Sequence, residues 1–216
     1  MEIRWIGHSC LQFKGGNIAV ITDPFSDEIG LKLPALQSDL VTVSHNHYDH
    51  NHVAGVTAKI VFDTPGEFEF GGIRIRGFRT WHDEEAGTAR GSNVMFMFEI
   101  DGVKVLHCGD LGHPLSPEFL EKINGVDVLA VPVGGKYTLS AAQAAQLVRD
   151  IEPKIVIPIH YHVPGLKIDI NNASDFINRL GSETRSVGTL SVTKKSLPTE
   201  GTIIYMLKPM ATAVAA

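Results

Sequence analysis

The sequence HNHYDH at residues 45–50 is the most informative stretch of this chain for its fold and for the ligands that it can bind. Three imidazoles and one carboxylate lie within six residues, directly after the apolar run LVTV at residues 40–43. Because side chains alternate along a strand, His45 and His47 point to the same side if the extended geometry continues to them. The last two donors of the motif fall where the chain must turn, so they can face a second metal. Nitrogen and carboxylate donors at this density favour zinc or a similar first-row cation.

Composition and charge narrow the class of protein. The length of 216 residues and the apolar fraction of 44% are typical of a globular chain with a sizeable core. A net charge of −5 without a Lys/Arg cluster weighs against nucleic acid as the main partner. The chain starts directly into a strand pattern, and no apolar run approaches the ~20 residues that cross a bilayer. With Cys10 and Cys108 predicted as free thiols, we expect a cytoplasmic protein that does not use a membrane. Its oligomeric state stays open.

Short strands separated by turns are predicted in the first half of the chain. Glycines, as at Gly15-Gly16, supply the turn chemistry, and Asp101-Gly102 is a hairpin signal. The expected strands are Glu2–Ile6, Cys10–Phe13, Ile18–Thr22, Leu40–Val43, Lys59–Phe62, Ile73–Arg79, Val94–Ile100 and Val103–Cys108.

Helices alternate with strands in the second half. The expected helices are Ser116–Ile123, Ser140–Ile151 and Asn172–Leu180, and the expected strands Asp127–Val131, Ile155–Ile159, Arg185–Val187, Leu190–Thr193 and Thr202–Met206. This order predicts an α+β or layered α/β architecture, in which two mixed sheets pack together and are covered by helices. We expect one domain over residues 1–208 and a disordered tail over residues 209–216.

Further metal-type donors follow other predicted strands. His82 comes after Ile73–Arg79, Asp110 lies between two glycines in the GDLG sequence at residues 109–112, and His160 follows Ile155–Ile159. Several strand ends that present such donors can converge on one rim, where the scaffold holds them rigidly.

The series HxHxDH, a lone histidine, GDxG and a late histidine resembles the metallo-β-lactamase superfamily. The GHS sequence at residues 7–9, TDPF at 22–25, GDLG at 109–112 and PIHY at 158–161 resemble its ascorbate-6-phosphate lactonase-like branch. The resemblance runs from about residue 2 to residue 208 and implies a layered αββα fold with two face-to-face mixed sheets.

The resemblance also implies a ligand set for two metal ions. His45, His47 and His82 would bind the first metal, and the second would have Asp49, His50 and His160. Asp110 would bridge the two. The implied cofactors are two Zn²⁺ ions, with Mn²⁺ or Fe²⁺ as alternatives on the same donors.

Neighbouring residues have open roles. Asp23 either belongs to a turn with Pro24 or accepts a hydrogen bond from a ligand imidazole, and the family favours the second. His113 is expected beside the cleft, while the loop around Lys136 and Tyr137 either approaches an anion or is a plain turn. Asn93 either orients the substrate or caps a loop. Four other histidines are weighed lower: His8 and His107 as structural, His52 and His162 as extra donors.

Two metals of this kind hold a hydroxide nucleophile at neutral pH and polarise the substrate oxygen, which predicts hydrolysis of a small ester, lactone or phosphate-bearing molecule. Asp49 and Asp110 are the candidate catalytic residues, with Asp49 as proton acceptor and Asp110 as the bridge. A phosphodiesterase or nuclease on the same fold is the first alternative, although the chain lacks its basic groove. Di-iron redox chemistry replaces the second histidine of the motif by glutamate in relatives, and His47 is present here. A metal-binding protein without turnover remains a third possibility.

Overall fold

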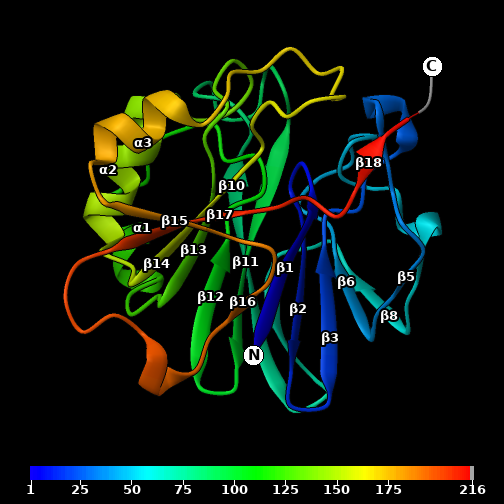
Figure 1. The fold of residues 1–216 in the computed structure, drawn as a ribbon, viewed down its shortest axis with the longest axis horizontal. Coiled ribbons are helices and arrows are strands. Elements are labelled where there is room, and N and C mark those ends of the chain that lie inside the picture. Colours follow the sequence, from blue (N-terminus) through cyan, green and yellow to red (C-terminus); the bar gives the residue numbers. More distant parts are fainter. Residues whose placement is uncertain (215–216) are drawn as a thin grey trace.

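Two mixed β-sheets form the framework of the protein in a computed structural model that describes residues 1–214. They lie side by side, with the smaller sheet built mainly from the first quarter of the chain (Figure 1). In spatial order, the smaller sheet contains β16 (Leu190–Ser191), β1 (Glu2–Gly7), β2 (Cys10–Gly15), β3 (Ile18–Thr22), β6 (Leu40–Thr42) and β8 (Ile60–Phe62).

The larger sheet combines a parallel part with an antiparallel meander. In spatial order, its strands are β15 (Glu183–Val187), β17 (Ile203–Leu207), β14 (Ile155–Ile159), β13 (Val128–Pro132), β12 (Val103–His107), β11 (Ser92–Ile100), β10 (Ile73–Trp81) and β9 (Gly66–Phe70). Two short pairs complete the strands: β4 (Leu31–Lys32) with β18 (Thr212–Ala213), and β5 (Leu36–Gln37) with β7 (Val56–Thr57).

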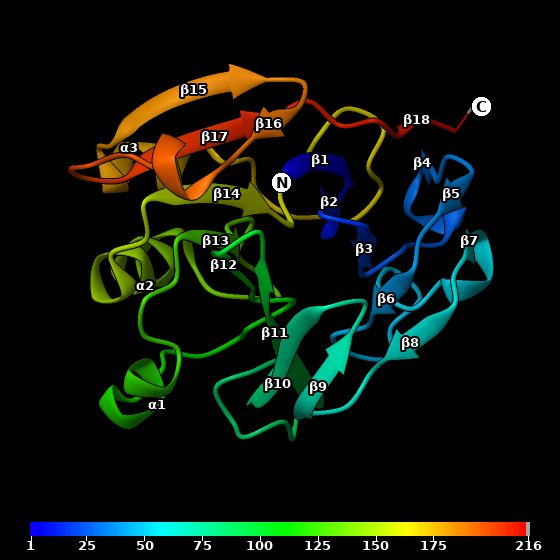
Figure 2. The same ribbon diagram turned by 90° about the horizontal axis from the view of Figure 1, so that it is seen from below.

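The α-helices all lie beside the larger sheet, as two perpendicular views show (Figures 1 and 2). They are α1 (Pro117–Lys122), α2 (Ala141–Ile151) and α3 (Ser174–Leu180), and the 3₁₀ turns are η1 (Asp27–Ile29), η2 (Val53–Gly55) and η3 (Lys194–Ser196). Ser140 caps α2 with a capping box to Gln143, as its sequence predicts. The layered α+β prediction is confirmed, with the helical cover on the side of the larger sheet.

An apolar core fills the space between the sheets. Phe13 on β2 and Phe98 on β11 meet there with ring centroids 5.8 Å apart, and both are fully buried. Strands β13 and β14 read as continuous apolar runs because the larger sheet is covered by α-helices on its other face. Burial of these side chains supplies the main driving force for folding.

Part of the C-terminal segment that was expected to be disordered forms a strand. Thr212–Ala213 pairs with Leu31–Lys32 as β18, and the backbone N–H of Ala211 donates to Ile6. Backbone hydrogen bonds to β4 and to Ile6 hold this segment without any long apolar pattern that the sequence would reveal. Residues 215–216 of the predicted tail lie outside the described residues. Within residues 1–214, no helix is both long and apolar enough to cross a membrane.

The directions of the strands place the candidate ligands at one edge of each sheet. In the smaller sheet, β3 runs parallel to β6, and β1 runs parallel to β3 because each is antiparallel to β2. In the larger sheet, β10, β12 and β14 share one direction for the same reason. In each sheet, therefore, the strands that precede the candidate ligands all end at the same edge.

Candidate metal centre

Glycines let the loops after the strands approach one another closely. A Cβ at Gly109, which has a φ of +55°, would lie 2.5 Å from the Cβ of Ser44. A Cβ at Gly112 would lie 2.3 Å from the backbone carbon of His82. The GDLG sequence therefore seats Asp110 against the loops that carry His45 and His82, and a side chain at either glycine would push these ligands apart.

The three histidines predicted for the first metal lie together. Ring nitrogens of His45, His47 and His82 are all within 4.8 Å of one another. His45 and His82 are buried, whereas His47 is exposed at the mouth of the site. The His45 and His47 rings meet edge-on with centroids 4.4 Å apart, although β6 ends at Thr42 and residues 44–47 form a bend, so the extended geometry on which the alternation depended does not reach them.

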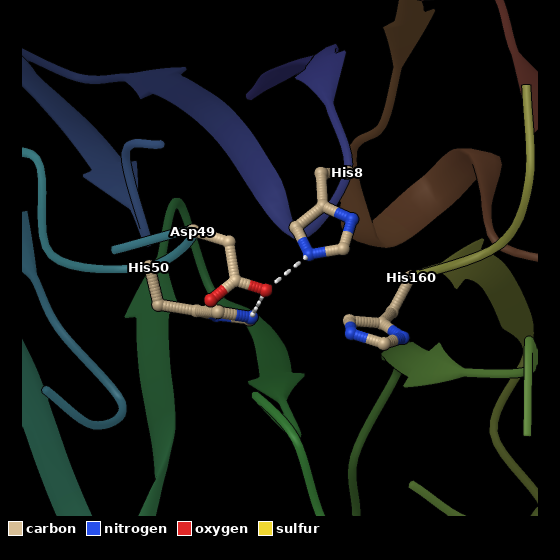
Figure 3. A group of neighbouring side chains, drawn as sticks. All are labelled: His8, Asp49, His50 and His160. Atoms are coloured by element: carbon tan, nitrogen blue, oxygen red, sulfur yellow. Dashed lines mark hydrogen bonds and ion pairs between the residues drawn. The ribbon is translucent and has the colours of Figure 1, made fainter. Parts of the chain in front are cut away.

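The residues predicted for the second metal lie together as well, and a further residue joins them. Donor atoms of Asp49, His50 and His160 are within 4.8 Å of one another and of a ring nitrogen of His8 (Figure 3). His8 and Asp49 belong to the side of the smaller sheet, and His160 follows β14 of the larger sheet. The group therefore forms only when the two sheets pack.

Asp110 lies between the two groups. Its Oδ2 is 3.2 Å from the Nε2 atoms of His50, His82 and His160, and 3.9 Å from that of His45. Two of these histidines come from each predicted set. A single carboxylate placed in this way can serve two metal ions at once, which is the bridging role that the sequence resemblance implies.

Buried polar atoms without partners test whether a metal fits. Among the described residues, His45 Nε2, His50 Nε2 and Asp110 Oδ1 are buried and make no hydrogen bond. An unsatisfied buried polar atom costs about 1–3 kcal/mol, so three in one cluster are costly for a metal-free protein. Coordination would satisfy them, and imidazole and carboxylate donors suit zinc, manganese or iron. The residues present therefore fit a metal centre.

Hydrogen bonds fix the Nδ1 atoms of the candidate ligands His45 and His50. Asp23 is fully buried, and its Oδ2 lies 3.0 Å from His50 Nδ1. It also accepts hydrogen bonds from the Ser44 backbone N–H at 2.7 Å and the Ser44 hydroxyl at 2.6 Å. Ser44 Oγ in turn lies 2.9 Å from His45 Nδ1. An outer carboxylate that fixes the far nitrogen of a ligand imidazole is the usual support of a metal-binding histidine. Asp23 thus occupies the accepting role that the sequence favoured.

The electrostatics of the cluster favour a cation at its centre. Burial acts to raise the pKa of Asp110, but the charges of His160 and His50 hold that pKa well below its usual range. Burial likewise acts against ionisation of Asp49, yet the charge of His50 keeps the pKa of Asp49 below its ordinary value. For His50, burial lowers the pKa, but Asp110 and Asp49 raise it well above the ordinary value. A proton on His50 balances the carboxylates, and a metal ion would supply the same positive charge.

Other predicted residues have different surroundings. Asn93 is fully buried: its Nδ2 donates to Thr80 Oγ1 and Cys108 O at 2.8 and 2.9 Å, and its Oδ1 accepts from the Asp110 backbone N–H at 3.0 Å. It therefore supports the Asp110 loop and does not face substrate. His113 Nε2 accepts from the backbone N–H of Trp81 at 3.2 Å, directly before the candidate ligand His82.

The Gly134-Gly135 loop has a packing role. A Cβ at Gly134 would lie 2.3 Å from the carbonyl oxygen of His160, and the Gly134 backbone N–H donates to that oxygen at 3.0 Å. Close approach to the His160 backbone thus explains this glycine without an anion. Lys136, next in the loop, pairs with Asp169 at 2.6 Å.

Three other histidines, His52, His107 and His162, lie outside the groups of neighbouring donor atoms. His52 and His162 are exposed, and His107 is fully buried with its Nε2 2.8 Å from the carbonyl oxygen of Ser9. His8 is the residue that the sequence analysis assigned to structure and that the fold places among the donors. The only signal for this role in the sequence was that His8 follows the first strand, within the GHS sequence at residues 7–9.

A cleft of about 670 Å³ opens onto the cluster. It is lined by His47, Tyr48, Asp49, His82, Ala89, Arg90, Asp110, Tyr137, His160, Lys167, Ile168 and Asp169. Clefts of this size accommodate small molecules. Five candidate ligands line its floor or walls, so a bound molecule would contact the metal-binding groups directly.

Comparison with known proteins places the chain in a family. The family model described as a beta-lactamase superfamily domain matches residues 2–160. A UPF0173 protein from Pyrococcus furiosus is 31% identical over 186 residues, which cover 74% of this chain and 83% of the relative. A UPF0173 metal-dependent hydrolase from Methanoregula boonei is 31% identical over 187 residues, covering 75% and 82% of the two chains.

A solved structure agrees with both relatives. The crystal structure of a protein of the metallo-beta-lactamase superfamily from Thermotoga maritima superimposes with a TM-score of 0.79 and 35% identity. The match covers 95% of this chain and 98% of that one. Fold, clustered donors and sequence matches lead to one conclusion: the chain belongs to the metallo-beta-lactamase superfamily and is a metal-dependent hydrolase of its UPF0173 group.

Proposed function

We propose that the protein is a dinuclear zinc-dependent hydrolase that acts on a small ester, lactone or phosphate-bearing substrate. The observation that carries this proposal is the position of Asp110 Oδ2, 3.2 Å from histidines of both donor groups, at the floor of a small cleft. When bound, two metal ions would supply an activated water at neutral pH and polarise the substrate oxygen. Manganese or iron on the same donors is the alternative.

The residues of the chain have distinct tasks in this reaction. His45, His47 and His82 would hold one metal, Asp49, His50 and His160 the other, and Asp110 both. Asp49 lies at the cleft, where its carboxylate would accept the proton released when water attacks. Tyr48 and Tyr137, exposed on the rim, offer apolar faces to a substrate.

Two cations in the cleft favour a negatively charged substrate. Arg90 and Lys167 line the cleft, and neither forms an ion pair within residues 1–214, whereas Lys136 is neutralised by Asp169. Their position contrasts with the net charge of −5 for the whole chain. An anionic group, phosphate or carboxylate, on the substrate would satisfy both.

Arg90 is held in place for this role. The Asp83 carboxylate accepts hydrogen bonds from four backbone N–H groups of the loop, those of Glu85, Gly87, Ala89 and Arg90, the last at 2.7 Å. The Arg90 guanidinium carbon lies 5.5 Å from the centroid of the Tyr137 ring. A loop fixed by its own carboxylate, with the cation resting on an aromatic ring, loses little entropy when an anion binds.

Removing and restoring the metal tests the proposed function. Protein from metal-replete expression should contain two metal ions per chain and hydrolyse at least one member of a panel of small esters, lactones and phosphodiesters. Treatment with a chelator should abolish this turnover, and Zn²⁺ or Mn²⁺ should restore it. Elemental analysis and the panel assay give the result. Less than one equivalent of metal, or turnover that survives in metal-free protein, would refute the proposal.

Charge removal in the cleft tests the anionic substrate. On a pair of esters that differ only by one carboxylate or phosphate, Arg90→Gln with Lys167→Gln should raise KM about tenfold for the anionic member alone. The estimate follows because exposed ion pairs contribute up to about 1 kcal/mol each and 1.4 kcal/mol is a factor of ten. Arg74→Gln with Lys195→Gln, exposed cations outside the cleft, is the matched control. Equal KM changes for both esters would contradict the role.

A further inference from the structure

His8 sits at the junction of the two sheets, directly after β1. It is fully buried, and its carbonyl oxygen accepts hydrogen bonds from Trp5 Nε1 at 2.9 Å and from the His160 backbone N–H at 3.1 Å. The Trp5 ring also stacks on Tyr161, with centroids 4.9 Å apart. The backbone of His8 is therefore tied both to its own strand and to the ligand loop of the other sheet.

Its side chain turns into the group of metal donors. Nε2 lies 3.1 Å from Asp49 Oδ2, and the same oxygen is 3.5 Å from His50 Nε2 (Figure 3). The His8 ring lies against the His160 ring, with centroids 4.3 Å apart. His8 thus touches donors from both sheets, one through its main chain and ring and one through a hydrogen bond.

The contact with Asp49 fixes which ring nitrogen of His8 carries a proton. An ionised carboxylate only accepts, so the contact with Asp49 needs a proton on Nε2. Nδ1 has no hydrogen-bond partner within the described residues, so a proton there would be unsatisfied. The Nε2–H tautomer therefore donates to Asp49, and while it does so Nε2 has no lone pair for a metal.

The backbone of His8 is strained in a way that suits this task. Its φ of +51° is positive, which is uncommon for residues other than glycine, although histidine is enriched there together with asparagine and aspartate. His160, at the facing loop, has a φ of +49°. Such conformations cluster where the surrounding structure holds a functional side chain in one direction.

We propose that His8 is a positioning residue of the metal centre: its Nε2–H holds Asp49 Oδ2 in the direction that serves the second metal. The carboxylate has enough acceptor sites to take this hydrogen bond and a metal together. The proposal rests on the two-metal centre proposed above, but it concerns how one ligand is oriented. It predicts that the donor at this position, and no other property of histidine, sets the affinity for the second metal.

Three substitutions separate the donor from shape and from backbone fit. In His8→Gln, the amide nitrogen is as many bonds from Cα as Nε2, so the donor stays in reach of Asp49. In His8→Asn, the amide is only as far out as Nδ1, although asparagine accepts the left-handed backbone best. His8→Leu removes the donor and keeps an apolar side chain. His162→Gln is the control, because His162 is an exposed histidine outside the groups of neighbouring donor atoms.

The measurement is the affinity of purified protein for each of two Zn²⁺ equivalents, by competition with a chelator, with Co²⁺ absorption spectra alongside. His8→Asn and His8→Leu should weaken the second equivalent by about 10–100-fold, as loss of an outer hydrogen bond does, and leave the first unchanged. His8→Gln should recover most of this loss with the wild-type Co²⁺ spectrum. His162→Gln should leave both affinities unchanged. Thermal unfolding of the metal-free variants identifies any that fail to fold.

The results that would contradict the proposal can also be told apart. If His8→Gln weakens the second equivalent as much as His8→Leu and alters the Co²⁺ spectrum, then His8 is itself a ligand and the positioning role is wrong. If His8→Asn, which suits the backbone, binds both equivalents as tightly as the wild type, the hydrogen bond has no role in metal binding. The Asn and Gln pair decides the question even if the Leu variant does not fold. Wild-type protein without a second equivalent would instead refute the two-metal centre, and this proposal with it.

Discussion

Replacing Asp110 with alanine should empty both metal positions and abolish turnover. Its Oδ2 lies 3.2 Å from His50, His82 and His160, so the substitution removes the one anionic donor shared by both groups. The loss of affinity should exceed the about 10–100-fold that substitution of outer supporting residues causes. Metal content after dialysis, measured by elemental analysis beside the wild type, checks the result.

A structural carboxylate gives the control for this substitution. Asp127 is also buried, and it accepts hydrogen bonds from Lys194 Nζ and the Lys104 backbone N–H, far from the donor groups. Asp127→Ala should lower the thermal stability of the protein while both metals stay bound. An Asp110→Ala protein that folds and retains two metals per chain would show that Asp110 is no bridge.

Replacing Asp49 with asparagine should lower the hydrolytic rate by about 10²–10⁴, the usual contribution of a general acid or base. The substitution keeps the shape of the side chain and a neutral oxygen donor, but the amide cannot take a proton at neutral pH. Asp49→Ala goes further, because it removes the donor and should weaken the second metal while His45, His47 and His82 keep the first. Rates on the substrate found by the panel, together with metal content, separate the two effects.

The proton role has its own contrary outcome. Full activity of Asp49→Asn with both metals bound would leave Asp49 as a ligand only. The His8 contact adds a check, since the carboxamide can still accept a hydrogen bond from His8 Nε2 through its oxygen. A change confined to rate, with unchanged metal affinity, is therefore what loss of the proton acceptor predicts.

Most of the framework could be predicted from the sequence because its elements carry local signals. Ile18–Thr22 and Ile155–Ile159 have the predicted bounds, and the other expected strands and helices differ by a few residues at their ends. Strand β9 was missed although its sequence GEFEF alternates charged and aromatic residues, the pattern of a half-buried strand. The pairing of Thr212–Ala213 was missed because a two-residue strand has no pattern of its own.

The candidate ligands could be predicted for a similar reason. They lie in the loops that follow β6, β10, β12 and β14, and the shared strand directions bring those strand ends to one edge of each sheet. The predicted sets His45–His47–His82 and Asp49–His50–His160 coincide with groups of neighbouring donor atoms, although the metals that they would bind stay a prediction. For Asn93, the sequence left open a contact with substrate, and burial beside Asp110 assigns it to support.

The sequence by itself determined the kind of donors and their places at strand ends, because both are written within a few residues of each other. Only the tertiary structure decided which histidines meet which carboxylates. His8 reaches Asp49 across 41 positions of the chain, and its carbonyl oxygen pairs with the backbone of His160 on the other sheet. Contacts of this kind depend on how two sheets pack and on a left-handed turn at one residue, and no local pattern of residues encodes either.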